Sequence, residues 1–238
     1  MSCVAGKVVL ITGGSEGYGK ATAKLFYEQG AKVIIAARNV DKMEMAKREI
    51  GGIDTFRMDV TDYSDWERAS EYVTQNYGKI DFLINNAGGG VAIKDVDSLT
   101  KEEIDRTIQL NLLSVVYAGN IFGRMMKEQQ DGTIINVASV CARQAWPQWS
   151  VYAAAKAGVL NFSKGLYTEL QPYNVRVSCL IPAAASTGFQ KNANLEASTA
   201  NLQPEDIANT ALYICQLPQH AVVEDVTVWG SNQVVVPL

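Results

Sequence analysis

The chain has 238 residues, of which 47% are hydrophobic and 19% charged, and its formal net charge is -4. This balance fits one globular domain with a full apolar core. An acidic chain without blocks of like charge gives no sign of a surface that binds nucleic acid. No apolar stretch approaches the roughly 20 residues that a membrane helix needs, so we expect no membrane partner.

The cysteines and the single histidine limit the chemistry that the chain can perform. The four cysteines form no C-x-x-C pair, which argues against a zinc site, and we expect no bound metal. Free thiols and the lack of a secretory h-region after Met1 indicate a cytoplasmic protein. His220 is the only histidine, which argues against a Ser-His-Asp triad and H-E-x-x-H zinc chemistry. Acid–base chemistry in this chain must use another residue type.

A glycine-rich turn follows the first predicted strand. Residues 7–12 form an almost continuous apolar run, typical of a parallel strand buried on both faces, and a helical pattern covers residues 20–29. Gly13, Gly17 and Gly19 lie at this junction. Glycines let the backbone approach a pyrophosphate, and the following helix supplies oriented N–H groups. The segment is therefore a candidate dinucleotide-binding turn.

The end of the second predicted strand, residues 32–37, bears on the choice of dinucleotide. Folds that bind NAD often have an acidic residue there, which bonds the ribose 2′-hydroxyl. This chain has Ala37 followed by Arg38, whose planar guanidinium can pair with a 2′-phosphate. Glu16 acts in the opposite direction, because its negative charge would lie near that phosphate. We expect NADP(H) to be preferred, with NAD(H) as the alternative.

Further strands and helices alternate along the rest of the chain. Strands are predicted at residues 55–58, 79–84, 133–138, 176–181 and 223–229, and helices at 41–50, 62–77, 100–127, around Tyr152 and at 204–217. Asp62 and Thr100 are predicted to cap their helices. With no linker or repeat, the pattern predicts an α/β fold: a Rossmann-type doubly wound parallel sheet of about seven strands flanked by helices, in a single domain over residues 1–238. Residues 184–203 are poorly patterned and are the candidate substrate lid.

Tyr152 and Lys156 are four residues apart, on one face of a predicted helix. A nearby ammonium lowers the pKa of a phenol, which could make Tyr152 a general acid and base near neutral pH. Ser139 follows the strand over residues 133–138 and is a candidate hydrogen-bond donor to a substrate carbonyl. Asn111 could hold a water behind Lys156, or could simply bond to the backbone. Alone, each of these signals is weak, since most Tyr-x-x-x-Lys patterns are solvated helix faces.

Two other strand ends carry candidate cofactor contacts. Asp59 and Val60 follow the third strand, where an adenine ring could lie. Asn86, Ala87 and Gly88 follow the fourth strand and could form a backbone wall against a cofactor, although a purely structural turn is the alternative.

Taken in order and at this spacing, the motifs resemble the short-chain dehydrogenase/reductase family, in its compact one-domain branch. The resemblance implies that Tyr152 is the general acid in reduction and the base in oxidation, that Ser139 polarises the carbonyl, and that Lys156 lowers the tyrosine pKa and bonds the nicotinamide ribose. Asn111 would support a proton-relay water. The implied cofactor contacts are Gly13, Ser15, Gly17, Tyr18, Gly19, Arg38, Asp59, Val60, Asn86, Ala87, Gly88, Tyr152, Lys156, Pro182 and Thr187.

The resemblance implies an oxidoreductase that interconverts a ketone or aldehyde with an alcohol and forms a homodimer or homotetramer. A 3-oxoacyl thioester reductase is one alternative, although the acidic chain does not favour an acyl-carrier partner. A non-catalytic dinucleotide-sensing regulator is another. Candidate substrate-pocket residues are Val140, Cys141, Arg143, Gln144, Trp146, Trp149, Ala184 and Phe189. Tyr18 departs from the family pattern, which usually has an aliphatic residue there.

Overall fold

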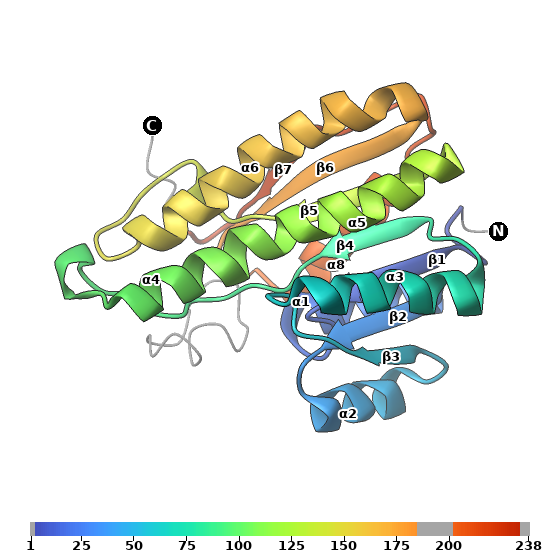
Figure 1. Ribbon diagram of the computed structural model, residues 1–238, viewed down its shortest axis with the longest axis horizontal. Coiled ribbons are helices and arrows are strands. Elements are labelled where there is room, and N and C mark those ends of the chain that lie inside the picture. The colour runs from blue at the N-terminus through green and yellow to red at the C-terminus, as the bar shows by residue number, and fades with distance from the viewer. Residues whose placement is uncertain (1–2, 185–201, 234–238) are drawn as a thin grey trace.

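The apolar runs of the sequence become the strands of one parallel sheet. The computed structural model describes residues 3–184 and 202–233 (Figure 1). Seven strands are hydrogen-bonded in the order β3-β2-β1-β4-β5-β6-β7. They are β1 (Val8–Thr12), β2 (Lys32–Ala37), β3 (Asp54–Arg57), β4 (Phe82–Asn85), β5 (Gly132–Val137), β6 (Val175–Pro182) and β7 (Asp225–Val228). The predicted Rossmann-type doubly wound sheet is confirmed.

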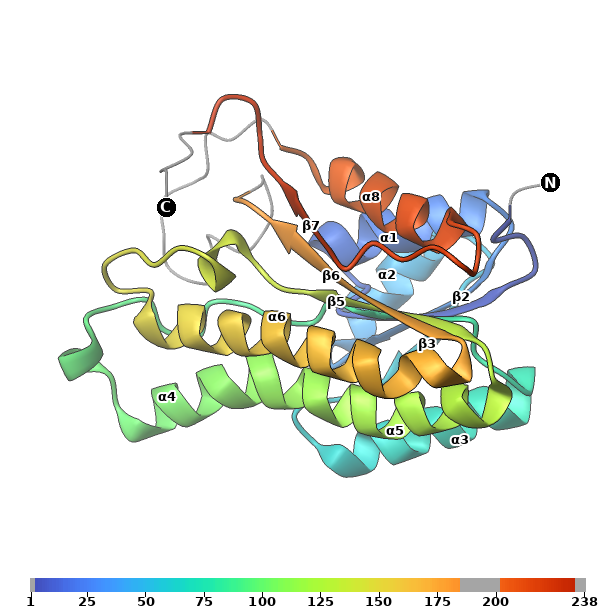
Figure 2. The ribbon, with the colours of Figure 1, turned by 90° about the horizontal axis from the view of Figure 1, so that it is seen from above.

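Helices cover both faces of this sheet (Figure 2). Helices α1, α2 and α8 pack on one face, and α3, α5 and α6 pack on the other. The bounds are α1 (Gly17–Glu28), α2 (Val40–Ile50), α3 (Tyr63–Tyr77), α4 (Lys101–Ile108), α5 (Ser114–Gln129), α6 (Ser150–Leu170) and α8 (Pro204–Gln216). Among the described residues, no helix combines the length and the apolar character needed to cross a bilayer.

The two core layers arise from the alternation of side chains along each strand. In β1, Val9 and Ile11 contact the layer that contains Phe26 of α1. Val8 and Leu10 of the same strand contact the opposite layer. A strand buried on both faces must be apolar at every position, which is why the continuous apolar run over residues 7–12 predicted this strand.

The predicted helix caps at two N-termini are confirmed. The Asp62 side chain accepts a 2.9 Å hydrogen bond from the backbone N–H of Ser64 at the start of α3. Thr100 and Glu103 form a reciprocal capping box at the start of α4. Each cap satisfies backbone donors that the first helical turn leaves unpaired.

Two details of the predicted helices differ in the structure. Helix α1 begins at Gly17 rather than at residue 20, so the last glycines of the turn already belong to the helix. The helix predicted over residues 100–127 is helical without a break, but a π-helical turn at Gln109–Leu113 lies between α4 and α5. Such turns insert one residue into an otherwise unchanged apolar pattern, and they occur frequently at functional sites.

The strand order reverses between β1 and β4, which are neighbours in the sheet. Loops that leave the carboxyl ends of these two strands diverge to opposite faces, and ligands of open α/β sheets bind in the crevice that results. The predicted lid over residues 184–203 lies almost wholly outside the described residues.

Candidate active site

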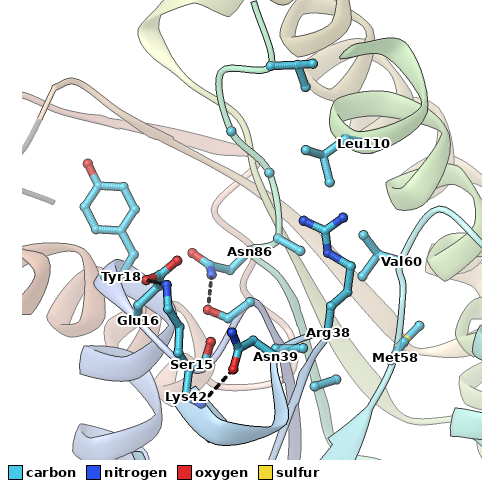
Figure 3. A pocket seen from close by; sticks show the side chains of 18 of the residues that line it. Ser15, Glu16, Tyr18, Arg38, Asn39, Lys42, Met58, Val60, Asn86 and Leu110 are labelled. Carbon is cyan, nitrogen blue, oxygen red and sulfur yellow. Dashed lines mark hydrogen bonds and ion pairs between the residues drawn. The ribbon is translucent and has the colours of Figure 1, made fainter. Parts of the chain in front are cut away.

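A cavity of about 590 Å³ opens at the carboxyl ends of β1 to β4 (Figure 3). Its lining residues come from the glycine turn, the end of β2 and the start of α2, the segments after β3 and β4, and the end of α4 with the start of the π-helical turn. They are Gly13, Ser15, Glu16, Gly17, Tyr18, Ala36, Ala37, Arg38, Asn39, Lys42, Met58, Val60, Asn86, Ala87, Gly88, Gly89, Gly90, Val91, Arg106 and Leu110. The lining joins the ends of β1, β2, β3 and β4, whereas Ser139 at the end of β5 and Pro182 at the end of β6 do not line the cavity.

The glycine turn can exist only with glycine at its key positions. Gly13 and Gly17 have φ angles of 65° and 54°, a backbone region that side chains rarely adopt. A Cβ on Gly19 would lie 2.3 Å from the carbonyl oxygen of Gly13. Gly19 therefore does not line the cavity; it lets the first turn of α1 pack directly beneath the loop. This open cradle fits the pyrophosphate of a dinucleotide.

The turn after β4 is bonded directly to the glycine turn. The Thr12 hydroxyl accepts hydrogen bonds from the backbone N–H of Asn86 and of Ala87, at 3.1 and 3.0 Å. The Asn86 amide donates a 2.9 Å bond back to the carbonyl of Thr12. Asn86 thus holds the two walls of the cavity together, in addition to lining it.

Charged residues gather at the end of the cavity formed by β2 and the start of α2. Arg38 is 3.9 Å from the Asp59 carboxylate, and its side chain is 59% exposed. The ammonium of Lys42 lies 2.7 Å from the Glu16 carboxylate. Asp59 does not line the cavity; it contacts Arg38 from the side.

Ser139 and Tyr152, the expected catalytic hydroxyls, meet where β5 ends and α6 begins. Tyr152, on the first turn of α6, is 6% exposed and shares a hydrogen bond with Ser139. Ser139 follows β5, and its hydroxyl also accepts a 3.2 Å bond from the backbone N–H of Cys141. The Trp149 ring packs edge-on against Tyr152, with ring centroids 5.5 Å apart. These contacts fix the rotamers of both hydroxyl-bearing side chains.

Lys156 is buried beside this pair. It is 3% exposed, and its ammonium donates a 2.9 Å hydrogen bond to the carbonyl of Val137. Burial lowers the pKa of Lys156 to about 8, so the side chain is mainly protonated at neutral pH.

The expected lowering of the Tyr152 pKa was wrong, because the structure raises it. Burial raises the pKa of Tyr152 above its ordinary value, the neighbouring Cys141 raises it further, and the hydrogen bond with Ser139 lowers it only in part. The Lys156 ammonium lies 5.8 Å from the centre of the Tyr152 ring, while its hydrogen bond goes to Val137. Desolvation of the phenolate in this apolar environment is the largest cause of the raised pKa.

Asn111, in the π-helical turn, is completely buried and bonds to the wall after β4. Its side-chain oxygen accepts a 2.9 Å bond from the N–H of Gly89, and its amide nitrogen donates to the carbonyls of Gly89 and Thr107. A Cβ on Gly88 would lie 3.0 Å from Asn111 Oδ1 and 3.2 Å from Lys156 Nζ. Gly88 is therefore the thin wall between the cavity and the group formed by Asn111 and Lys156.

The remaining predicted residues lie around this centre or beyond the described residues. Pro182 ends β6, and the next residue, Ala183, accepts a 3.2 Å hydrogen bond from the Tyr18 hydroxyl. Trp146 and Trp149 pack with Cys141 and Tyr152, whereas Arg143 forms an ion pair with Asp225. Thr187 and Phe189 lie outside the described residues.

Sequence reasoning missed several residues that line the cavity, among them Lys42, Asn39, Arg106 and Leu110. The available signal for Lys42 was a second basic residue one helical turn after Arg38. Arg106 and Leu110 come from the end of α4 and the π-helical turn, and nothing in their spacing pointed to the cavity.

A parallel sheet with a glycine-turn cavity at its switch point defines a Rossmann-type protein. The family model for the short chain dehydrogenase matches residues 7–198. The chain therefore belongs to the short-chain dehydrogenase family. An uncharacterized oxidoreductase from Staphylococcus aureus (strain MRSA252) is 31% identical over 231 residues, which cover 96% of this chain and 99% of the relative.

Two solved structures have closely similar folds. An alcohol dehydrogenase from the archaeon Thermococcus sibiricus, complexed with 5-hydroxy-NADP, superposes with a TM-score of 0.89 at 26% identity, covering 97% of this chain and 99% of that chain. A 3-ketoacyl-(acyl-carrier-protein) reductase from Brucella melitensis, complexed with NADH, superposes with a TM-score of 0.88 at 31% identity, covering 97% of this chain and 100% of that chain.

Proposed function

We propose that this short-chain dehydrogenase interconverts a ketone or an aldehyde with the corresponding alcohol, with NADP(H) as the preferred cofactor and NAD(H) as the alternative. The observation that carries the proposal is the hydrogen-bonded pair of Ser139 and Tyr152, with Lys156 behind the Gly88 wall of the cavity. A phenol and a hydroxyl that share a hydrogen bond, one helical turn from a buried ammonium that adjoins the cavity wall, are suited to carbonyl reduction.

In this mechanism the nicotinamide ring supplies the hydride when the cofactor is bound. The hydroxyls of Ser139 and Tyr152 donate hydrogen bonds to the substrate carbonyl oxygen and polarise it. Tyr152 transfers its proton to that oxygen as the carbonyl carbon gains hydride. Because burial raises the pKa of Tyr152, the phenol is protonated at neutral pH and has a proton to give. The charge of Lys156 then compensates the phenolate.

The cofactor contacts follow from the lining of the cavity. Gly13, Ser15, Gly17 and Tyr18 would surround the pyrophosphate, and Val60, Asn86, Ala87 and Gly88 would lie along the adenosine and toward the nicotinamide. Arg38 would bind a 2′-phosphate, because its ion pair with Asp59 is long and its side chain is more than half exposed. The likeness to an alcohol dehydrogenase solved with 5-hydroxy-NADP supports this choice.

A 3-oxoacyl thioester reductase is the second candidate. The structural likeness to a 3-ketoacyl-(acyl-carrier-protein) reductase favours it, at 31% identity. The net charge of -4 argues against an acidic carrier as partner, because like charges slow association. Turnover of a 3-oxoacyl thioester far above that of simple ketones would favour this candidate.

Assembly and location complete the proposal. We expect a homodimer or homotetramer, which sedimentation equilibrium would measure. A cytoplasmic location is supported by the four cysteines, all within the described residues and all free thiols.

The test combines cofactor binding with turnover. Fluorescence titration should give a lower dissociation constant for NADPH than for NADH, and a panel of ketones and aldehydes should oxidise NADPH. Tighter binding of NADH would refute the NADP preference. Tight cofactor binding without turnover of any carbonyl substrate would instead support a nucleotide-sensing regulator.

A further inference from the structure

The charged end of the cavity contains an ion pair that the proposed function does not use. Lys42 Nζ lies 2.7 Å from Glu16 Oε2, and the two side chains are 49% and 51% exposed. Both residues line the cavity together with Arg38 (Figure 3). The pair joins the residue preceding α1 to the first turn of α2.

The position of Glu16 explains why its charge matters. Glu16 is the N-cap residue of α1, but its side chain makes no capping hydrogen bond to that helix. Its carboxylate is bonded to Lys42 instead. Without that partner, a carboxylate at this end of the cavity would repel a 2′-phosphate and would accept a hydrogen bond from a 2′-hydroxyl.

The position of Lys42 is fixed relative to Arg38. Asn39, directly after Arg38, caps α2 by accepting a 2.9 Å hydrogen bond from the backbone N–H of Lys42. This cap sets the start of α2 and places Lys42 in its first turn; the Lys42 side chain extends toward Glu16, whereas Arg38 extends toward Val60 and Leu110 (Figure 3).

We propose that Lys42 is a specificity-determining residue that favours NADP(H) by neutralising Glu16. Arg38 is the phosphate contact, and Lys42 removes the repulsion that Glu16 would otherwise exert on the phosphate. This inference rests on the proposed function, because it requires that the cavity bind a dinucleotide. It concerns the ratio of the affinities for NADP(H) and NAD(H), and not the reaction.

A double-mutant cycle tests the proposal through binding alone. Dissociation constants for NADPH and NADH are measured at one ionic strength for wild type, Lys42→Met, Glu16→Gln and the double variant. Lys42→Met should weaken NADPH binding about tenfold, which is the scale of one interaction with a charged group, and NADH binding less than about twofold. In the Glu16→Gln background, Lys42→Met should raise the NADPH dissociation constant less than about threefold, because residue 16 then carries no negative charge to repel the phosphate.

Two further variants serve as controls. Lys20 forms an ion pair with Glu49 between the same two helices, yet it is not among the residues that line the cavity. Lys20→Met changes the net charge equally and should leave both dissociation constants within about twofold. Lys42→Arg keeps the charge and should retain the wild-type ratio of affinities. All of these side chains are partly exposed, so each variant should fold, and thermal melting checks that it does.

Two results would overturn the proposal. One is an equal loss of NADPH and NADH affinity in Lys42→Met. The other is an undiminished loss of NADPH affinity when Glu16 is already Gln, which would make Lys42 a plain phosphate contact. A wild type that prefers NADH would refute the NADP preference of the proposed function, yet a selective loss of NADPH affinity in Lys42→Met would still support the role of Lys42.

Discussion

The ammonium of Lys156 donates a 2.9 Å hydrogen bond to the carbonyl oxygen of Val137, the last residue of β5. Ser139 follows two residues later, so this bond ties α6 to the strand end that carries the serine. Tyr152 lies one turn before Lys156 on the same helix. Lys156 therefore joins the end of β5, which carries the Ser139 hydroxyl, to α6, which carries the Tyr152 hydroxyl. Such a connection fixes the two hydroxyls relative to each other before a substrate binds.

Replacing Tyr152 by Phe should abolish turnover and leave cofactor binding intact. The substitution removes only the hydroxyl, and loss of a general acid lowers rates by about a hundred- to ten-thousandfold. We expect kcat to fall within that range, with the NADPH dissociation constant within a few-fold of wild type. Steady-state kinetics and fluorescence titration measure both.

Tyr213→Phe is the matched control for this substitution. Tyr213 lies on α8 and is 56% exposed, so the loss of its hydroxyl should leave kcat unchanged. A Tyr152→Phe enzyme that retained most of its activity would remove Tyr152 from the proposed mechanism.

The pH dependence of the two reaction directions should differ. Burial raises the pKa of Tyr152, so the phenol is protonated throughout the neutral range. Reduction needs the protonated phenol and the charged Lys156, so its rate should be flat from about pH 6 to pH 7 and fall as the pH passes the Lys156 pKa of about 8. Oxidation needs a phenol that can accept a proton back, so its rate should rise with the pH from about 6 to 7. Initial rates in both directions across this range provide the test, and oxidation that slows with rising pH would contradict the assignment.

The sequence predicted those parts of the molecule that depend on local patterns. Continuous apolar runs indicated strands buried on both faces, and capping residues such as Asp62 and Thr100 located helix starts. The glycine turn was recognisable because a positive φ at Gly13 and a close backbone approach at Gly19 leave no other residue type.

What the sequence could not supply depends on distances between segments. Periodicity predicted one helix over residues 100–127 and did not reveal the π-helical turn between α4 and α5. No spacing rule connects Glu16 with Lys42, which meet only because α1 and α2 are neighbours on one face of the sheet. The prediction of a lowered Tyr152 pKa was wrong for the same reason, since the burial that raises this pKa depends on how the site packs.

Asp81 should be a determinant of stability at neutral pH. It is 3% exposed, and its carboxylate accepts 2.8 Å bonds from Lys7 and from Lys79 and a 2.9 Å bond from the backbone N–H of Val8. Burial raises the pKa of Asp81, but these hydrogen bonds outweigh burial and hold the pKa below its ordinary value. Asp81→Asn should lower the free energy of unfolding by about 2 kcal/mol at pH 7, the scale of hydrogen bonds to a charged group.

The sign of the pH effect follows from the lowered pKa. The carboxylate contributes stability above its unfolded-state pKa of about 4, and this contribution is lost as the pH falls through the lower folded-state pKa. Urea unfolding should therefore show the difference between wild type and Asp81→Asn shrinking under strongly acidic conditions. Asp105→Asn, which removes an exposed ion pair with Lys101, should cost less than about 0.5 kcal/mol. A difference that grew at low pH would contradict the role of Asp81.

Adding one methyl group at Gly88 should damage the site far more than adding it at Gly89. A Cβ on Gly88 would lie 3.0 Å from Asn111 Oδ1 and 3.2 Å from Lys156 Nζ, whereas a Cβ on Gly89 would meet nothing within 4 Å. Gly88→Ala should push Lys156 or Asn111 out of place, and misplaced catalytic groups cost about a hundredfold in rate. Gly89→Ala adds the same methyl group beside the same cavity and should keep kcat within about threefold. Steady-state kinetics of both variants test this prediction, and circular dichroism confirms that each variant folds. Equal losses of kcat would contradict it. They would mean that Gly88 is only part of the cavity wall and that its proximity to Lys156 and Asn111 does not position those side chains.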